Sequence, residues 1–359
     1  MAGTTDQTGR SSRGVLLVNL GSPDSTSVAD VRRYLHQFLM DRYVIDVPYL
    51  MRKMIVCLSI LPTRPKQTAA AYRAIWGPDG SPLIAISRRV QAALQERLDL
   101  PVGLAMRYGR PGIKQSLDAL LDRLDGNDPV VHVMPLYPHF AQATYKTVVE
   151  EIARVTRHLR RPVRLEYLPP FYEEPHYIRA LADSLQESLR WDYDHVLFSY
   201  HGIPEKHVRK EDRSGAHCLA RDHCCEVDAP ARRTCYRAHV YATTRAVVAS
   251  TGIAADKHSV AFQSRLGRDP WLRPFTDFEY ERLAEAGVRR LLVVCASFVA
   301  DCLETLEEIE IHGNESFRAC GGEELRLVPC LNDNPSWIDT LEGWCRSGWN
   351  DPEWGRLDP

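Results

Sequence analysis

One histidine is a candidate base because of where its strand is expected to stop. His201 closes the apolar run that begins at residue 195, and Gly202 and Pro204 follow it. Glycine and proline interrupt a strand, so we expect the imidazole at a loop rather than inside a sheet. Near pH 7 an imidazole accepts and releases a proton at little cost, which suits a general base. The alternative is a structural role, which is the more common role of a lone histidine after a strand.

A row of carboxylates follows a second apolar run. Asp301, Glu304 and Glu308 are spaced i, i+3 and i+7, which places them on one face of a predicted helix over residues 301–311. Acidic residues at a helix start often do no more than complement the helix dipole. A row on one face can also pass a hydrated divalent cation inward or carry protons outward, because hard oxygen ligands hold such a cation weakly. With His201, the row predicts a site that removes protons and guides a cation.

Eight apolar or β-branched runs are expected to form the strands that position these residues. Most of the segments between them have helical periodicity, as a parallel α/β sheet requires. Strands that are apolar throughout are typical of sheets buried on both faces, so the predicted fold class is α/β, with two doubly wound, Rossmann-like domains on four-stranded parallel sheets. The runs are 14–20, 102–108, 130–137 and 163–168 in the first domain and 196–201, 259–264, 290–297 and 325–331 in the second.

Ligands of open α/β sheets bind at the carboxyl ends of the strands. The residues at or just past these ends are Asn19, Arg107, Tyr108, Tyr137, His201, Ser264 and Phe298. Asn19 to Pro23 also follow a strand, but they have neither the GxGxxG spacing nor a P-loop lysine, so we expect no nucleotide.

Length and composition narrow the function class. The 359 residues are enough for two domains, and a net charge of −2 gives no support to a nucleic-acid partner. No run reaches the roughly 18 apolar residues of a membrane helix, and the start lacks the features of a signal peptide. We therefore expect a cytoplasmic protein whose ten cysteines are reduced.

Three motifs together resemble the signatures of the ferrochelatase family. They are the segments 198–204, 262–271 and 301–308, which read FSYHGIP, FQSRLGRDPW and DCLETLEE. The resemblance extends from residues 17–23 through 106–108 and 136–138, and it is closest to the bacterial type with an internal cysteine-rich insert. It implies a two-domain chelatase-like fold and a lyase that inserts ferrous iron into protoporphyrin IX, releasing two protons, as the terminal step of haem biosynthesis.

The resemblance also implies roles for individual residues. His201 corresponds to the base and Glu304 to its catalytic partner across the metal path, and Asp301 and Glu308 extend that path. The segment 38–48 resembles the family's active-site lip. Because the substrate is hydrophobic, we expect peripheral contact of this lip with the inner membrane face. The implied porphyrin-binding residues are Leu20, Arg107, Tyr108, Tyr137, Ser264, Trp271 and Phe298.

The expected domain order follows from the strands and motifs. Residues 1–12 form a disordered tail, and residues 13–172 form the first domain together with a C-terminal helix at about 333–348. Residues 173–332 form the second domain, which carries His201, the insert 211–237 and the acidic helix. The protein is expected as a monomer or a homodimer.

The insert concentrates thiols. Cys218, Cys224, Cys225 and Cys235 lie within 18 residues. Four thiolates suit a 2Fe–2S cluster, with structural zinc as an alternative. An animal-type cluster is excluded, because the first ligand position of the animal enzymes is Gln142 here and no cysteine follows Cys345. The spacing C-x5-C-C-x9-C is not a common zinc or ferredoxin pattern, so reduced thiols without metal remain an alternative.

Other functions stay open at this point. The substrate could be coproporphyrin, the metal could be cobalt or nickel, or the protein could bind and deliver haem without catalysis. A carrier requires an axial ligand but not a row of carboxylates, so Glu304 separates the two classes.

Overall fold

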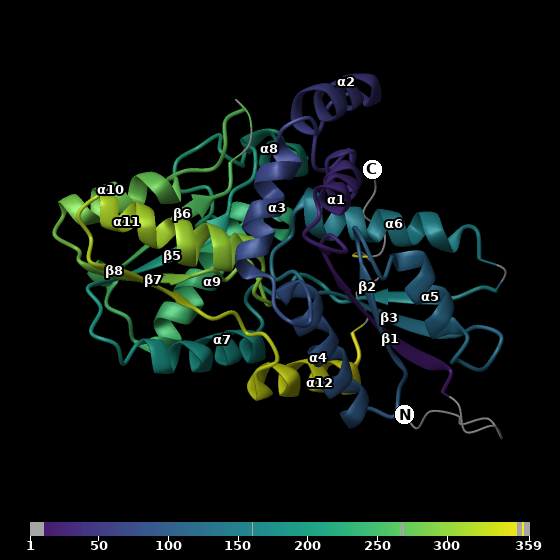
Figure 1. Cartoon of the computed structure of the whole chain (residues 1–359). Coiled ribbons are helices and arrows are strands. Elements are labelled where there is room, and N and C mark those ends of the chain that lie inside the picture. Colours follow the sequence, from purple (N-terminus) through teal and green to yellow (C-terminus); the bar gives the residue numbers. More distant parts are fainter. Residues whose placement is uncertain (1–10, 160, 266, 268, 350–353, 355–359) are drawn as a thin grey trace. The chain divides into compact units, whose positions relative to one another are not determined.

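The computed structural model describes residues 11–159, 161–265, 267, 269–349 and 354 (Figure 1). The chain forms two compact units. The first comprises residues 1–137, 142–170 and 338–359, and the second comprises residues 138–141 and 171–337. The tail predicted over residues 1–12 lies almost entirely outside the described residues.

A four-stranded parallel sheet forms the centre of the first unit. Its order is β2-β1-β3-β4, and β1 pairs with β2 from Val15↔Val102 to Asn19↔Met106. Leu16 and Leu17 in the central strand are fully buried, and burial of one such side chain contributes about 1.5–3 kcal/mol. The strands are β1 (Arg13–Asn19), β2 (Val102–Met106), β3 (Val130–Pro135) and β4 (Arg164–Tyr167).

Helices and loops connect these strands by crossovers. Before β2 come α1 (Val28–Leu39), α2 (Tyr49–Met54), the π-helix η1 (Ile55–Ile60), α3 (Arg64–Ile75) and α4 (Pro82–Arg97). After β2 come α5 (Ile113–Leu121), the π-helix η2 (Gln142–Lys146) and α6 (Thr147–Thr156).

The second unit repeats the architecture. Its sheet has the order β6-β5-β7-β8, all parallel, and in Figure 1 α10 and α11 lie on one side of it and α7 and α9 on the other. Leu197, Ala261, Leu291 and Val293 form its buried core together with Phe317. The strands are β5 (His195–His201), β6 (His258–Gln263), β7 (Arg290–Val294) and β8 (Glu324–Val328).

The helices of this unit include the acidic segment. They are α7 (Pro175–Ser188), α8 (Glu205–Glu211), the 3₁₀ helix η3 (Pro230–Thr234), α9 (Tyr236–Thr251), the 3₁₀ helix η4 (Ala255–Lys257), α10 (Thr276–Glu285), the π-helix η5 (Leu303–Gly313) and α11 (Asn314–Ala319). The helix α12 (Pro335–Ser347) closes the chain, and from Ile338 onward it belongs to the first unit. There Arg97 of α4 pairs with Asp339 and Glu342.

The predicted fold class and all eight strands are confirmed. Every strand lies within a few residues of its predicted run, and both sheets are parallel and four-stranded. His201 is the last residue of β5, Arg107 follows β2 and Ser264 follows β6, so each lies at a carboxyl edge. Each of the two carboxyl edges therefore carries predicted site residues of its own unit.

Candidate functional site

The His201 ring is held in one tautomer by the next peptide. Its Nδ1 lies 2.6 Å from the carbonyl oxygen of Gly202. A carbonyl oxygen can only accept, so Nδ1 carries the proton and Nε2 keeps its lone pair. No hydrogen bond to Nε2 is found among the described residues, and the ring is half-buried. In the neutral ring Nε2 is therefore the nitrogen at the end of β5 that can accept a proton.

Two aromatic residues predicted to contact porphyrin lie beside this histidine. The Phe298 ring meets the His201 ring edge-on, with centroids 6.3 Å apart. Trp271 pairs with Pro204 by a backbone bridge, and a Cβ on Gly202 would lie 3.3 Å from the Trp271 ring. The same Cβ would lie 2.7 Å from the carbonyl oxygen of Gln263, so only glycine fits here.

Gln263 ties the histidine to the acidic helix. Its carbonyl oxygen accepts from Gly202 N–H at 2.7 Å, and its Nε2 donates to the Glu304 carbonyl at 2.8 Å. Its Oε1 accepts from the Ser199 hydroxyl at 2.8 Å, so the amide orientation is fixed. Gln263 was absent from the predicted site, although the signature FQSR contains it. It fixes Glu304, a half-buried residue of η5, relative to the His201 peptide.

Ser264 contacts the acidic row directly. It has φ +63°, an uncommon value for a residue with a side chain, and its hydroxyl donates to Glu308 at 2.5 Å. Burial raises the pKa of Glu308, while the hydrogen bond from Ser264 and the nearby His201 lower it. The structure thus brings Ser264, His201 and Glu308 together in the second unit.

The predicted acidic helix is wrong in its type and in its first residue. It is a π-helix that begins at Leu303, and Asp301 precedes it. The i→i+5 hydrogen bonds of a π-helix change the spacing that was expected to place the three carboxylates on one face. Glu304 and Glu308 still lie on this helix, whereas Asp301 does not.

Asp301 makes a closed set of hydrogen bonds instead. Its carboxylate accepts from Asn332 Nδ2 at 2.6 Å, from the Thr305 hydroxyl at 3.1 Å and from Cys330 N–H at 3.3 Å. The residue is 7 % exposed. In this arrangement Asp301 anchors the start of η5 and the loop after β8, so of the three predicted carboxylates it is the one committed to structure.

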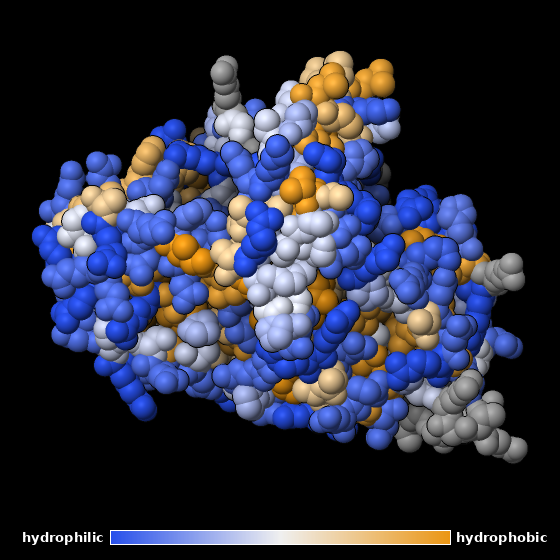
Figure 2. Space-filling model, in the orientation of Figure 1, coloured by the Kyte–Doolittle hydropathy of each residue, from blue (hydrophilic) through white to orange (hydrophobic). Residues whose placement is uncertain are grey.

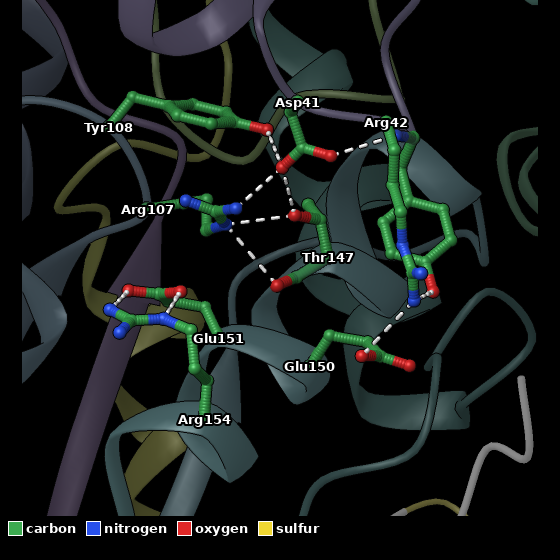
Figure 3. A network of polar contacts seen from close by, with 9 residues as sticks. Asp41, Arg42, Arg107, Tyr108, Thr147, Glu150, Glu151 and Arg154 are labelled. Atoms are coloured by element: carbon green, nitrogen blue, oxygen red, sulfur yellow. Dashed lines mark hydrogen bonds and ion pairs between the residues drawn. The ribbon is translucent and has the colours of Figure 1, made fainter. Parts of the chain in front are cut away.

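The first unit contributes a separate polar network at the end of β2 (Figure 3). Arg107 donates from Nη2 to Asp41 at 2.5 Å and from Nε to the Thr147 hydroxyl at 2.8 Å. Tyr108 donates its hydroxyl to the same Asp41 oxygen at 2.9 Å, and burial raises the pKa of Tyr108, which keeps the hydroxyl protonated. The sequence did not single out Asp41 or Thr147, yet both fix the predicted Arg107.

Two more predicted porphyrin-binding residues lie at this edge. Leu20 is half-buried, and its carbonyl accepts from Tyr108 N–H at 2.8 Å. The Tyr137 hydroxyl is buried and has no hydrogen-bond partner among the described residues. Burial also raises the pKa of Tyr137, so the phenol remains a donor. A buried donor without a partner is costly, which makes Tyr137 a candidate contact for a bound ligand.

The segment that follows the predicted lip of residues 38–48 carries the exposed large apolar side chains described in the first unit. After α1 the chain turns through residues 41–47 and enters α2 and η1. Leu50 and Leu58 are each 73 % exposed, and Tyr49, Met51 and Met54 are exposed with them. Apolar side chains cover α2 in Figure 2.

The four cysteines of the insert lie together in the second unit. All are buried, and the Cys235 thiol is hydrogen-bonded to Cys218 and Cys225, while Cys225 contacts Cys224. Arg237 Nη1 lies 3.5 Å from the Cys225 sulfur. Within the described part of the chain, no three or more His, Cys, Asp or Glu side chains form a ready metal-binding group. The thiols are thus gathered without a preformed ligand shell.

No helix among the described residues is long and apolar enough to cross a membrane.

Comparisons with known proteins assign the family. Residues 12–348 match the family model described as Ferrochelatase. A protein named Ferrochelatase from Pseudomonas fluorescens (strain Pf0-1) is 50% identical over 333 residues, covering 92% of this chain and 96% of its own. A second of that name, from Azotobacter vinelandii, is 51% identical over 335 residues, covering 93% and 98%.

A solved structure agrees at the level of the fold. The structure titled SirB from Bacillus subtilis with Fe3+ has a TM-score of 0.51 and 12% identity, and it covers 93% of this chain and 94% of that one. At this identity the likeness supports the α/β fold alone. The family match and the sequence relatives carry the assignment, and they confirm the resemblance of the motifs. The chain belongs to the ferrochelatase family, lyases of haem synthesis that insert a metal ion into a porphyrin, and it is of the bacterial type.

Proposed function

We propose that the protein inserts ferrous iron into protoporphyrin IX, with His201 as the base and Glu304 as its partner. The observation that carries the proposal is that Gln263 holds both the peptide next to His201 and the backbone of Glu304. His201 Nδ1 bonds the Gly202 carbonyl, and Nε2 has no hydrogen-bond partner among the described residues. A porphyrin holds two pyrrole protons that must leave as iron enters. A neutral imidazole nitrogen can accept one proton at a time and return it to solvent through neighbouring carboxylates.

The half-buried carboxylates suit the handling of the incoming iron. Glu304 and Glu308 are hard oxygen ligands that bind Fe2+ and release it, whereas the buried Asp301 is engaged with Thr305 and Asn332. The raised pKa of Glu308 also lets it accept a proton at a higher pH than an ordinary glutamate. Glu308 is therefore suited to take a proton from His201 as well as to pass iron.

The porphyrin itself would lie against apolar and aromatic side chains. Phe298 and Trp271 flank His201 and offer flat surfaces for a macrocycle. In the first unit the Tyr137 hydroxyl, which has no hydrogen-bond partner among the described residues, is free to donate to a bound ligand. Arg107 is already paired with Asp41, which also accepts from Tyr108. We therefore assign to Arg107 first the positioning of Asp41 and Tyr108, and only second a contact with a propionate.

Replacement of Glu304 by Gln tests whether the protein is an enzyme or a haem carrier. The amide keeps the shape but loses the charge, so we expect iron insertion to fall by about 10²–10³-fold. Porphyrin affinity, measured by fluorescence quenching, should stay near that of the parent. Glu310→Gln removes a charge from an exposed position of the same helix and is the matched control. A Glu304→Gln variant with parental turnover would contradict the assignment.

We propose that the four buried thiols hold a 2Fe–2S cluster, with zinc as the second candidate. The donor type suits either group, because the four cysteines are buried, their thiols contact one another and Arg237 lies beside two of the sulfurs, although the thiols would have to move closer together to form a complete ligand shell. The contact with Cys235 and burial raise the pKa of Cys225 more than the guanidinium of Arg237 lowers it, so a bound metal would have to displace the thiol protons. Such a group would supply a covalent bridge between the parts of the insert, as structural metal sites do.

Metal and sulfide analysis of protein purified without oxygen tests this proposal. We expect about two irons and two acid-labile sulfides per chain, the composition of the cluster. Cys235→Ser should lose them, whereas Cys320→Ser, at an exposed cysteine outside the insert, should retain them. Zinc in place of iron would support the second candidate, and colourless protein with neither metal would contradict both.

Peripheral binding to an anionic membrane through α2 and η1, which follow the predicted lip, is also proposed. The exposed side chains of α2 and η1 are accompanied by the exposed cations Lys53, Arg64 and Lys66. Apolar burial and attraction to anionic lipid act together at such a surface. Sedimentation with vesicles of anionic and of neutral lipid measures it, and equal recovery from both kinds of vesicle or binding to neither would contradict the electrostatic part of the proposal.

A further inference from the structure

A tyrosine and a serine hold both polar groups of the His201 backbone. The Tyr236 hydroxyl donates to the His201 carbonyl oxygen at 2.7 Å and lies 2.9 Å from the Ser297 hydroxyl. His201 N–H lies 3.4 Å from the same Ser297 oxygen. Because the single phenol proton goes to the carbonyl, Ser297 must donate to Tyr236 and accept from His201 N–H. The three residues form a closed ring of hydrogen bonds.

The orientation of the imidazole depends on the peptide that Tyr236 holds. The His201 carbonyl and Gly202 N–H belong to one planar peptide unit. Tyr236 holds the carbonyl edge of this plane, and the Gln263 carbonyl holds the N–H edge at 2.7 Å. The Gly202 carbonyl at the next position then receives Nδ1–H of the ring. Loss of the phenol hydroxyl would free one edge of the plane that orients the ring.

Tyr236 is also the chain neighbour of the thiol site. Cys235 is the N-cap of α9 and Tyr236 is its first residue. The Cys235 thiol contacts Cys218 and Cys225, so its position depends on how those thiols are arranged. A metal–thiolate group at this site would fix Cys235 and with it the first turn of α9. One peptide bond therefore separates the thiol site from the hydroxyl that holds the base.

We propose that Tyr236 is a positioning residue for metal insertion, which makes the alignment of His201 depend on the state of the thiol site. This rests on the proposed role of His201 as the base. Tyr236 is buried, and its ring meets the His139 ring edge-on with centroids 5.8 Å apart, so packing limits its movement independently of the hydroxyl. The hydroxyl alone is thus the group to remove in a test.

The test compares Tyr236→Phe with Tyr200→Phe. Tyr200 is equally buried in the same unit, and its hydroxyl contacts Thr244 at 2.8 Å. We expect Tyr236→Phe to lower kcat by about 10–10²-fold, since a small misplacement of a catalytic group has effects of this size. KM for porphyrin should stay unchanged, because Tyr236 does not face the substrate in this proposal. Tyr200→Phe should keep the parental kcat.

A readout without turnover makes the test independent of metal loading. Nitrogen NMR of the histidine rings in metal-free protein reports the His201 tautomer, assigned with His201→Ala. The parent should show protonation at Nδ1, and Tyr236→Phe should show a mixture of tautomers. Ser297→Ala removes the other hydroxyl of the ring and should give the same mixture, which provides a second variant if Tyr236→Phe does not fold.

A double variant tests the dependence on the thiol site. If the state of Cys235 reaches His201 through Tyr236, Cys235→Ser should lower kcat in the parent and have little further effect in the Tyr236→Phe background. If Cys235→Ser and Tyr236→Phe instead lower kcat by independent factors that multiply in the double variant, the proposed coupling is overturned. Parental kcat and a parental tautomer in Tyr236→Phe, with His201→Ala inactive, would overturn the inference alone. Parental turnover in His201→Ala would instead overturn the proposed base.

Discussion

Replacement of His201 by Ala should lower kcat for iron insertion by about 10²–10⁴-fold, the range measured for removal of a general base. The physical reason is that Nε2 is the free imidazole nitrogen at the edge where Glu304 and Glu308 lie, while Nδ1 is committed to the Gly202 carbonyl. Initial rates of haem formation, at saturating porphyrin and iron, measure the effect.

Two controls separate loss of the base from loss of structure. His258→Ala removes a histidine from the opposite, amino end of the neighbouring strand β6, so it should keep the parental rate. Added imidazole should restore part of the activity of His201→Ala by entering the vacated space. A His201→Ala variant that inserts iron at the rate of His258→Ala would show that another group takes the protons.

Replacement of Asp41 by Ala should destabilise the protein by about 3–5 kcal/mol, because it leaves the buried Arg107 cation without its partner. The side chains of Arg107 and Asp41 are 14% and 5% exposed, and Asp41 also accepts from Tyr108 and Thr147. Its other oxygen accepts from Tyr43 N–H at 2.7 Å, so a single substitution breaks four hydrogen bonds around one charge. Urea unfolding, followed by tryptophan fluorescence, measures the loss.

An exposed ion pair in the same region provides the matched control. Arg42 and Glu150 lie 3.4 Å apart, with side chains 58% and 33% exposed (Figure 3). Glu150→Ala should change the free energy of unfolding by no more than about 1 kcal/mol, since water screens such a pair. Equal effects of Asp41→Ala and Glu150→Ala would mean that burial of the Arg107 pair is not what stabilises this edge.

The sequence predicted the strands well because most of them contain long apolar runs, with β4 (RLEY) and β8 (ELRLV) as the more polar exceptions. Buried parallel strands give an unambiguous pattern, and glycine or proline after β5 marked where His201 would emerge. The candidate base, the two aromatic residues beside it and the acidic residues Glu304 and Glu308 all lie in the second unit. Their proximity follows from the common carboxyl edge of parallel strands.

The acidic helix could not be predicted in the same way. Helical periodicity assumes α geometry, and a π-helix such as η5 is too rare for the pattern to favour it. The hydrogen bond that Asp301 accepts from Asn332 depends on the loop after β8, which lies 31 residues further along the chain. The sequence alone does not distinguish a carboxylate that is hydrogen-bonded within the fold from one that can bind iron.

Positioning residues were missed for a related reason. Asp41, Gln263 and Tyr236 act through hydrogen bonds to residues far along the chain, such as the 66-residue separation between Asp41 and Arg107. Gln263 and Asp41 lay within segments that carry the family resemblance, so the motifs contained the signal without giving the role. Tyr236 lay within the insert 211–237, where only the thiols were given a role, and only the structure connects its hydroxyl to His201.

The most direct test of the central claim is iron insertion into protoporphyrin IX by protein purified without oxygen, followed by loss of porphyrin fluorescence and appearance of haem absorbance. We expect the enzyme to turn over repeatedly with Fe2+, faster than with Co2+ or Ni2+, and to have a higher kcat/KM for protoporphyrin than for coproporphyrin. Tight binding of protoporphyrin without turnover for any of these metals would contradict it and favour a haem carrier.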